Sequence, residues 1–217
     1  MTYYNSNRRG GFLGNVPEVT RNIIIINIIM FAATWFAERM MHTDIMGIFA
    51  LYFPGSVHFR IWQPVTYMFM HGGFFHILFN MYTLLIFGSV VEQIIGQKKY
   101  LVFYLLCGLG AAGLHILMTS VLHLGVGPMV GASGAIYGVL IAYAMLFPES
   151  RMTLLFPPVT LSAKWMVAIF AAIELFTGIT GTVEGIAHFA HLGGMVMGFL
   201  LILYWKKRGV LFDREDL

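Results

Sequence analysis

Residues 129–147 read MVGASGAIYGVLIAYAMLF, an apolar run without a charged residue. Its length is close to the roughly 20 residues that an α-helix needs to cross about 30 Å of hydrocarbon. Five further apolar runs flank it, at residues 22–40, 74–91, 100–118, 165–179 and 186–205. They lack the alternating pattern of a membrane β-barrel. The sequence therefore predicts an all-α membrane protein with six transmembrane helices.

The composition of the chain also indicates a membrane environment. Hydrophobic residues make up 59% and charged residues 11% of its 217 positions, and the mean hydropathy is +0.79. A soluble domain is about half apolar and a quarter charged, so that class is excluded. The net charge of +3 could indicate a nucleic-acid partner. The placement of the basic residues explains the charge better, and no nucleic acid is expected.

Lysine and arginine concentrate on one side of the predicted helices. Of the 13 basic residues, all but Arg39 and Arg60 fall on the inner side if the N-terminus is cytoplasmic. Cytoplasmic loops carry such an excess of positive charge, so both termini are expected in the cytoplasm. We expect a cytoplasmic tail at 1–20 without a removable signal peptide, one membrane domain at 21–205 and a second tail at 206–217. Such short tails suggest a prokaryotic plasma membrane.

Residues 41–70, between the first two predicted helices, form an unusually long connection. They are rich in aromatic residues but are interrupted by Pro54, Gly55 and Pro64, which disfavour a regular spanning helix. We expect a long first loop at the membrane surface that dips partly into the bilayer. The single cysteine, Cys107, lies within an apolar run and indicates neither a disulfide nor a metal cluster.

Ser133 and His191 are expected at similar depths in the outer half of the membrane. Each lies near the outer end of a helix that runs inward. Gly131 and Gly134 flank the serine and leave its hydroxyl unobstructed. A hydrogen-bonded histidine is the usual way to activate a serine nucleophile. Glycines beside a serine can equally serve only the close packing of helices.

A glycine pair, Gly194 and Gly198, follows His191 on the last predicted helix. Its spacing lets the backbone of a neighbouring helix come close. If that neighbour carries Ser133, the hydroxyl and an imidazole come within hydrogen-bonding reach. His188 shares a face with His191. A metal site or a histidine bonded to a carbonyl therefore stays open as an alternative.

His76 and Asn80 lie one turn apart on the same face of the second predicted helix. Two such donors, with the backbone N–H of Ser133, could stabilise an oxyanion. The alternative is ordinary hydrogen bonding between helices, worth about 0.6 kcal/mol on average in membranes. Polar residues within a membrane are costly and usually mark function. Four of them at one depth favour the catalytic interpretation.

Together these motifs resemble those of rhomboid intramembrane serine proteases. The motifs are His76-x-x-x-Asn80, Gly131-x-Ser133-Gly134 and Ala190-His191-x-x-Gly194-x-x-x-Gly198. The resemblance covers almost the whole chain and implies a six-helix rhomboid-like bundle. It implies that Ser133 and His191 form a catalytic dyad without a carboxylate. It also implies an oxyanion hole formed by His76, Asn80 and the Ser133 amide.

The resemblance assigns several supporting residues as well. Tyr137 is expected to pack against the ring of His191, and the spacing of the glycines selects His191 rather than His188 as the base. His71 is expected to hydrogen-bond at the outer surface. Glu92 is expected to tie loops together near the cytoplasmic end of its helix.

Two positions keep no assigned role. Gln63 follows Trp62 where the family commonly has arginine, which removes a loop-anchoring charge and leaves the detail of the first loop open. Glu174 lies well inside the fifth predicted helix, where it could make a structural hydrogen bond, be neutral or face a water-filled cavity. No carboxylate lies within one helical turn of His191 in the sequence. We therefore expect none to orient it, and catalysis to be slow.

These observations predict an intramembrane serine endopeptidase that cleaves single-span or multi-span membrane proteins in the lipid bilayer near the outer leaflet. No cofactor or metal is expected, and the oligomeric state is not indicated. One alternative is an inactive rhomboid-like protein that binds other membrane proteins. Another is a metal transporter or membrane metalloenzyme built on histidines, although no H-E-x-x-H motif accompanies them. Its candidate ligands are His71, His76, His188 and His191.

Overall fold

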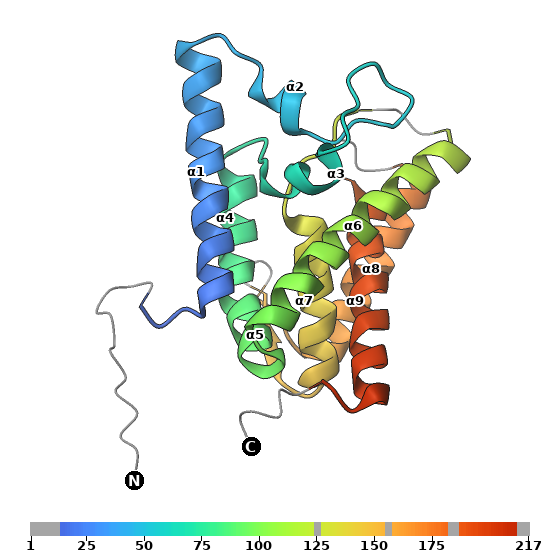
Figure 1. The fold of residues 1–217 in the computed structure, drawn as a ribbon. Coiled ribbons are helices and arrows are strands. Elements are labelled where there is room, and N and C mark those ends of the chain that lie inside the picture. The colour runs from blue at the N-terminus through green and yellow to red at the C-terminus, as the bar shows by residue number, and fades with distance from the viewer. Residues whose placement is uncertain (1–13, 124–126, 155–157, 182–186, 212–217) are drawn as a thin grey trace.

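A computed structural model describes residues 14–123, 127–154, 158–181 and 187–211 (Figure 1). Within these ranges the elements of regular secondary structure are helices apart from one small antiparallel hairpin, β1–β2, so the all-α prediction is confirmed. The elements in chain order are α1 (Glu18–Met40), α2 (Ile45–Phe49), α3 (Gln63–Thr66), η1 (Tyr67–Phe69), α4 (Phe74–Thr83), η2 (Leu84–Gly88), α5 (Ser89–Ile95), α6 (Gln97–Val121), α7 (Ser133–Leu146), β1 (Arg151–Thr153), β2 (Thr160–Ser162), α8 (Ala163–Thr180) and α9 (His188–Arg208). The predicted start of the last helix at Ile186 and parts of both predicted tails lie outside the described residues.

Five helical stretches of the described chain are long and apolar enough to cross a membrane. They are α1, the continuous stretch α4–η2–α5, α6, α8 and α9. The remaining apolar helix, α7, has 14 residues and is therefore about 21 Å long at 1.5 Å per residue. That is shorter than the hydrocarbon core of about 30 Å. The structure thus confirms a multi-pass helical bundle without confirming six complete spans.

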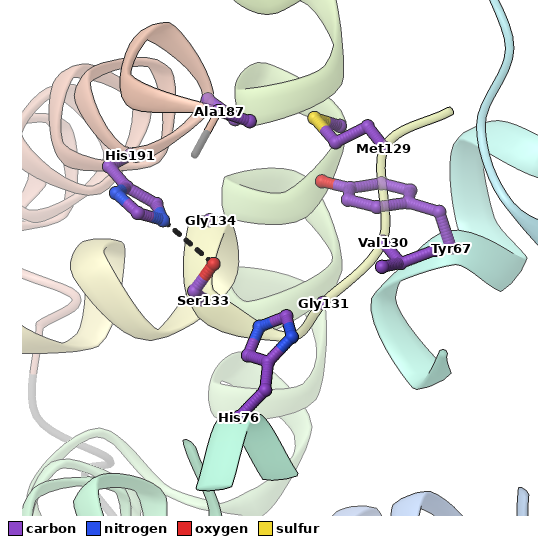
Figure 2. Close-up of a pocket in the computed structure, with 10 residues that line it drawn as sticks. Tyr67, His76, Met129, Val130, Gly131, Ser133, Gly134, Ala187 and His191 are labelled. Carbon is purple, nitrogen blue, oxygen red and sulfur yellow. Dashed lines mark hydrogen bonds between the residues drawn. The ribbon is translucent and has the colours of Figure 1, made fainter. Parts of the chain in front are cut away.

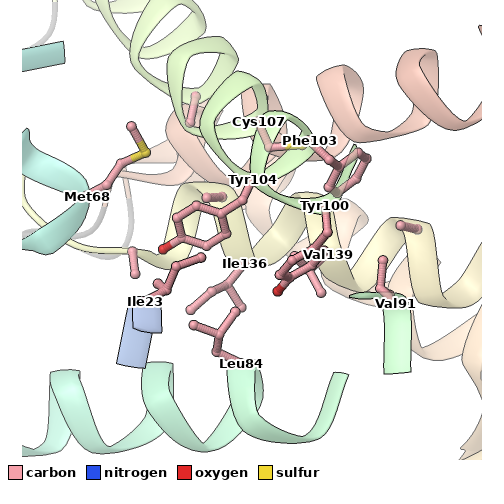
Figure 3. Close-up of a cluster of buried hydrophobic side chains, with 14 of the residues drawn as sticks. Ile23, Met68, Leu84, Val91, Tyr100, Phe103, Tyr104, Cys107, Ile136 and Val139 are labelled. Carbon is pink, nitrogen blue, oxygen red and sulfur yellow. The ribbon is translucent and has the colours of Figure 1, made fainter. Parts of the chain in front are cut away.

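Helix α7 lies in the middle of the bundle, with α4, α6, α8 and α9 around it (Figure 1). Its apolar side chains Ile136 and Val139 meet Leu84 from η2 and Tyr104 and Cys107 from α6 (Figure 3). All five side chains are at most 3% exposed. Because lipid is as apolar as these side chains, their close packing rather than water exclusion stabilises the contact. This packing fixes α7, and with it Ser133, against the neighbouring helices.

The backbones of helices α7 and α9 come into close contact at glycines on both helices. A Cβ added to Gly198 would lie 2.8 Å from the carbonyl oxygen of Gly138, and one added to Gly138 would lie 2.9 Å from the carbonyl oxygen of Gly194. Such distances are too short for a side chain at these positions. The neighbour of the glycine pair on the last helix, which the sequence left open, is therefore the helix that carries Ser133.

Gln63 organises the first loop, which contains α2, α3 and η1 instead of a spanning helix. Its Oε1 accepts hydrogen bonds from the backbone N–H groups of Tyr52 (3.3 Å) and Arg60 (3.1 Å). Its Nε2 donates to the carbonyl oxygens of Ile48 (3.3 Å) and His58 (2.9 Å). The side chain is completely buried. A neutral amide therefore anchors this loop, where an arginine is common in the family.

Glu92 connects α5 to the beginning of α1. Its two carboxylate oxygens accept hydrogen bonds from the backbone N–H groups of Val19 (2.9 Å) and Thr20 (2.7 Å). The first N–H groups of a helix have no partner within the helix and favour a negative charge nearby. Glu92 was expected to tie loops together, whereas in the structure it holds the N-terminus of a helix, α1.

Candidate active site

Ser133 is the first residue of α7, and the chain reaches it in an extended form. Met129 forms two backbone hydrogen bonds with Leu51 (2.8 and 2.9 Å), and the N–H of Gly131 donates to the carbonyl of Tyr67 (3.0 Å). The prediction of a helix from residue 129 is therefore wrong, because these backbone groups bond to the first loop instead. The N–H of Ser133 now lies at a helix N-terminus, where it has no acceptor within the helix.

The side chain of His191, on α9, lies beside Ser133. Its Nε2 is 2.8 Å from the Oγ of Ser133 (Figure 2). Tyr137, one turn along α7, stacks on the imidazole with the ring centroids 4.2 Å apart and the planes 9° from parallel. Three residues singled out from the sequence therefore meet at one point of the bundle. The stacked ring limits the orientations that the imidazole can adopt.

A carboxylate also contacts His191, so the expectation of none is wrong. Glu174, on α8, places its Oε1 2.8 Å from the Nδ1 of His191. Its Oε2 is 2.6 Å from the Nδ1 of His188, and the hydroxyl of Tyr137 donates to Oε1 at 2.7 Å. A carboxylate only accepts hydrogen bonds, so the His191 hydrogen resides on Nδ1 in this arrangement. The Nε2 of a neutral imidazole is then free to accept from the hydroxyl of Ser133.

A cavity of about 320 Å³ adjoins the serine and the histidine. Figure 2 shows Ser133 between His191 and His76, whose ring approaches from α4. The cavity is lined by Tyr67, His76, Met129, Val130, Gly131, Ser133, Gly134, Ala187, Ala190 and His191. It shares lining residues with a wider hollow of about 670 Å³ beside the first turn of α4. A space of this size has room for several water molecules.

Asn80 is not among the described residues that line this cavity. Its Nδ2 donates a hydrogen bond to the Nε2 of His71 at 3.0 Å, and both side chains are buried. The ring of His71 in turn meets the ring of His76 edge-on, with centroids 4.9 Å apart. His71 was expected to hydrogen-bond at the outer surface, and the bond that the structure gives it is this one to Asn80, with the His71 side chain only 3% exposed. His71 therefore contacts both His76, through its ring, and Asn80, through a hydrogen bond.

His71 acts as a neutral hydrogen-bond acceptor. Burial, and to a smaller degree the neighbouring His76, lower its pKa from 6.5 to about 3. A neutral imidazole can accept at Nε2, which a protonated one cannot. The amide of Asn80 therefore has a stable partner over the physiological pH range.

The four histidines of the metal-site alternative form two separate pairs. His71 contacts His76, whereas His188 and His191 both contact Glu174. Within the described parts of the chain, no group of three or more His, Cys, Asp or Glu side chains is arranged to hold a metal ion. The geometry gives no support to a site that would use all four rings.

Residues 58–208 match a family model described as the Rhomboid domain. The chain is 35% identical over 146 residues to the mouse presenilin-associated rhomboid-like protein, mitochondrial, which aligns over 64% of this chain and 38% of the mouse protein. It is 33% identical over 142 residues to RHOMBOID-like protein 1 of Arabidopsis thaliana, with 65% of this chain and 34% of the plant protein aligned. It is also 33% identical over 159 residues to a zebrafish presenilin-associated rhomboid-like protein A, mitochondrial, with 69% and 40% aligned.

The chain thus spans well under half the length of these curated relatives. Two of these relatives are named as mitochondrial, and the third comes from a plant. They therefore give no support to the expected prokaryotic plasma membrane.

Proposed function

Because the chain belongs to the rhomboid family, we propose that it is an intramembrane serine endopeptidase with Ser133 as nucleophile and His191 as general base. The observation that carries this proposal is the 2.8 Å separation of Ser133 Oγ and His191 Nε2 at the edge of the cavity. A serine is a poor nucleophile unless a base accepts its proton. Within hydrogen-bonding reach, the imidazole can take that proton as the bond to substrate forms.

The proposed reaction proceeds through an acyl-enzyme. Ser133 Oγ attacks the carbonyl carbon of a peptide bond while His191 Nε2 takes its proton. His191 then donates that proton to the departing amine as the C–N bond breaks. Water attacks the resulting ester while His191 takes its proton. His191 then returns that proton to Ser133 Oγ as the C–O bond breaks and the carboxylic acid leaves.

We propose that the oxyanion of the tetrahedral intermediate is stabilised by groups on the side of Ser133 that faces away from His191. The unpaired N–H of Ser133 at the start of α7 is one donor. The ring of His76, which lines the cavity, is a second. The amide of Asn80 has a further hydrogen beyond the one it donates to His71, and in this proposal that hydrogen assists from a deeper position.

The proposed substrates are transmembrane segments of other membrane proteins. A helix conceals its carbonyl groups in intrahelical hydrogen bonds, so a segment must unwind locally before its backbone can reach Ser133. Small or helix-breaking residues near the cleaved bond should therefore favour cleavage. The N-terminal end of α1 and the C-terminal end of α9 lie at the same end of the bundle (Figure 1). We propose that this end is cytoplasmic, which puts the site in the outer half of the membrane.

Labelling with a fluorophosphonate tests the proposal, because this probe reacts with activated serines. Purified protein in liposomes should be labelled at Ser133 and should cleave a single-span substrate, and Ser133→Ala should lose both reactions. Cleavage by Ser133→Ala at the wild-type rate would exclude this mechanism. A folded protein that binds membrane proteins but is neither labelled nor active would instead be the inactive relative.

A further inference from the structure

Glu174 is a buried carboxylate in the middle of a helix that can span the membrane, and the reaction proposed above does not use it. The residue is only 7% exposed. An ionisable side chain in this position is costly, and such residues usually mark functional sites. Three side chains surround its two oxygens at hydrogen-bond distance, from His188, His191 and Tyr137. These three hydrogen bonds offset the free-energy cost of burying the carboxylate.

We propose that Glu174 is a positioning residue for His191. It completes a continuous series in which the carboxylate holds the Nδ1–H of His191 and the Nε2 of His191 faces the hydroxyl of Ser133. This inference rests on the proposed protease function. It adds a third member to a site for which the sequence predicts two.

The geometry supports this role at both ends of the imidazole. The distance from Ser133 Oγ to Nε2 and the distance from Nδ1 to Glu174 Oε1 are both 2.8 Å. A carboxylate on Nδ1 fixes the tautomer that leaves Nε2 able to accept a proton. It also stabilises the positive charge that the ring carries once it has taken the proton from serine. In a medium of low dielectric constant, this stabilisation is stronger than in water.

The carboxylate itself is held in a single orientation. The hydroxyl of Tyr137 donates to the same Oε1 that receives His191, while Oε2 is engaged by His188. The ring of Tyr137 also stacks on His191. One residue thus fixes both the carboxylate and the plane of the imidazole, which leaves the ring little freedom to rotate away from Ser133.

A purely structural role is the competing explanation. Glu174 lies on α8, whereas His188 and His191 lie on α9. The carboxylate could therefore act only as a connection between the two helices. The two roles differ in what they affect. If Glu174 only connects the helices, all of its hydrogen bonds contribute to stability. If Glu174 positions His191, the bond to His191 decides kcat.

Glu174→Gln separates these roles because it keeps the shape of the side chain. An amide offers one acceptor oxygen and an NH₂ group, so it cannot accept from all three neighbours. The proteoliposome assay should show kcat reduced on the order of 10²–10⁴-fold, as in other serine hydrolases that exchange the orienting carboxylate for an amide. KM should change by less than about twofold, because no substrate contact is lost. Glu174→Asp retains the carboxylate and should recover part of kcat.

Glu92→Gln is the matched control. Glu92 is also a buried acid on a helix of the membrane bundle with two hydrogen bonds, but it holds the start of α1 and does not line the cavity. Its variant should lower the unfolding temperature and leave kcat unchanged. His188→Gln tests the connection between helices, since it alters the bond to Oε2 and leaves the bond to His191. It should affect stability more than kcat.

A tautomer measurement makes the inference independent of activity. Nitrogen NMR of ¹⁵N-histidine-labelled protein distinguishes protonation at Nδ1 from protonation at Nε2, and the signal missing from His191→Ala identifies His191. Wild type should carry the Nδ1 proton, and Glu174→Gln should show a mixture. Unchanged kcat and tautomer in Glu174→Gln, or an equal fall in kcat for His188→Gln, would overturn the inference. An inactive wild type with the predicted tautomer shift would refute the protease proposal alone.

Discussion

Gly194 of α9 lies directly against the carbonyl oxygen of Gly134 on α7. A Cβ built at Gly194 would lie 1.8 Å from that oxygen, a distance at which no side chain fits. The contact occurs one residue along α7 from Ser133 and one turn along α9 from His191. The 2.8 Å bond between those two side chains therefore depends on a backbone contact that any side chain at Gly194 would prevent.

Gly194→Ala should separate the two helices by about 1 Å or more and break the Ser133–His191 bond. A displacement of this size can cost on the order of 10²-fold in rate, so we expect that loss in the rate of fluorophosphonate labelling. Gly113→Ala is the control, because it lies on α6 and a Cβ there would meet nothing within 4 Å. Equal labelling of the two variants would show that the helices tolerate separation.

The helices of this fold could be predicted from the sequence because an apolar run and its length are local properties. The beginning of α7 could not. Residues 129–132 are as apolar as the helix that follows, but their backbone groups bond to Leu51 and Tyr67 of the first loop. Such pairing depends on how a distant segment folds, and local hydropathy does not predict it.

The pairing of Ser133 with His191 was predictable because glycine spacing and depth report which helix faces meet. The contact between Glu174 and His191 was missed because the two residues are 17 positions apart in the sequence and on different helices. A signal was present nonetheless. A lone acid in an apolar run requires a polar partner, and the two histidines on the following helix were the nearest candidates. Asking where its partner lies could have found the contact.

Gln63→Leu should destabilise the first loop. The variant keeps a similar size but leaves two N–H groups and two carbonyls of the loop without their present partner. Each buried polar group left unsatisfied costs about 1–3 kcal/mol, so we expect a clear fall in thermal stability in detergent and faster proteolysis within residues 41–70. Gln93→Ala, at an exposed position of α5, should change neither. Normal protease resistance in Gln63→Leu would contradict the anchoring role.

His71 should make the protein sensitive to acid. Its pKa is about 3 in the folded protein against an ordinary value of 6.5, so the unfolded chain binds a proton in this interval that the folded chain excludes. Stability should therefore fall as the pH drops below 6.5, by up to about 1.4 kcal/mol per unit from this group. His71→Gln retains an acceptor for Asn80 and removes the titration. Thermal unfolding between pH 7 and 4 should show a shallower slope for the variant, and identical slopes would disprove the assignment.

Gly131→Ala should impair the site without disturbing the helices. Gly131 has a φ of +125°, which side chains rarely adopt, and a Cβ there would lie 2.8 Å from Nε2 of His76. Backbone strain of this kind costs about 1–3 kcal/mol, and relief requires that His76 or the approach to Ser133 move. We expect labelling of Ser133 to slow by on the order of 10-fold or more while the unfolding temperature changes little. Gly127→Ala is the control in the same connection, since a Cβ there meets nothing within 4 Å. If both variants are labelled at the wild-type rate, the position of His76 is not set by Gly131, and its proposed part in the oxyanion hole loses its structural basis.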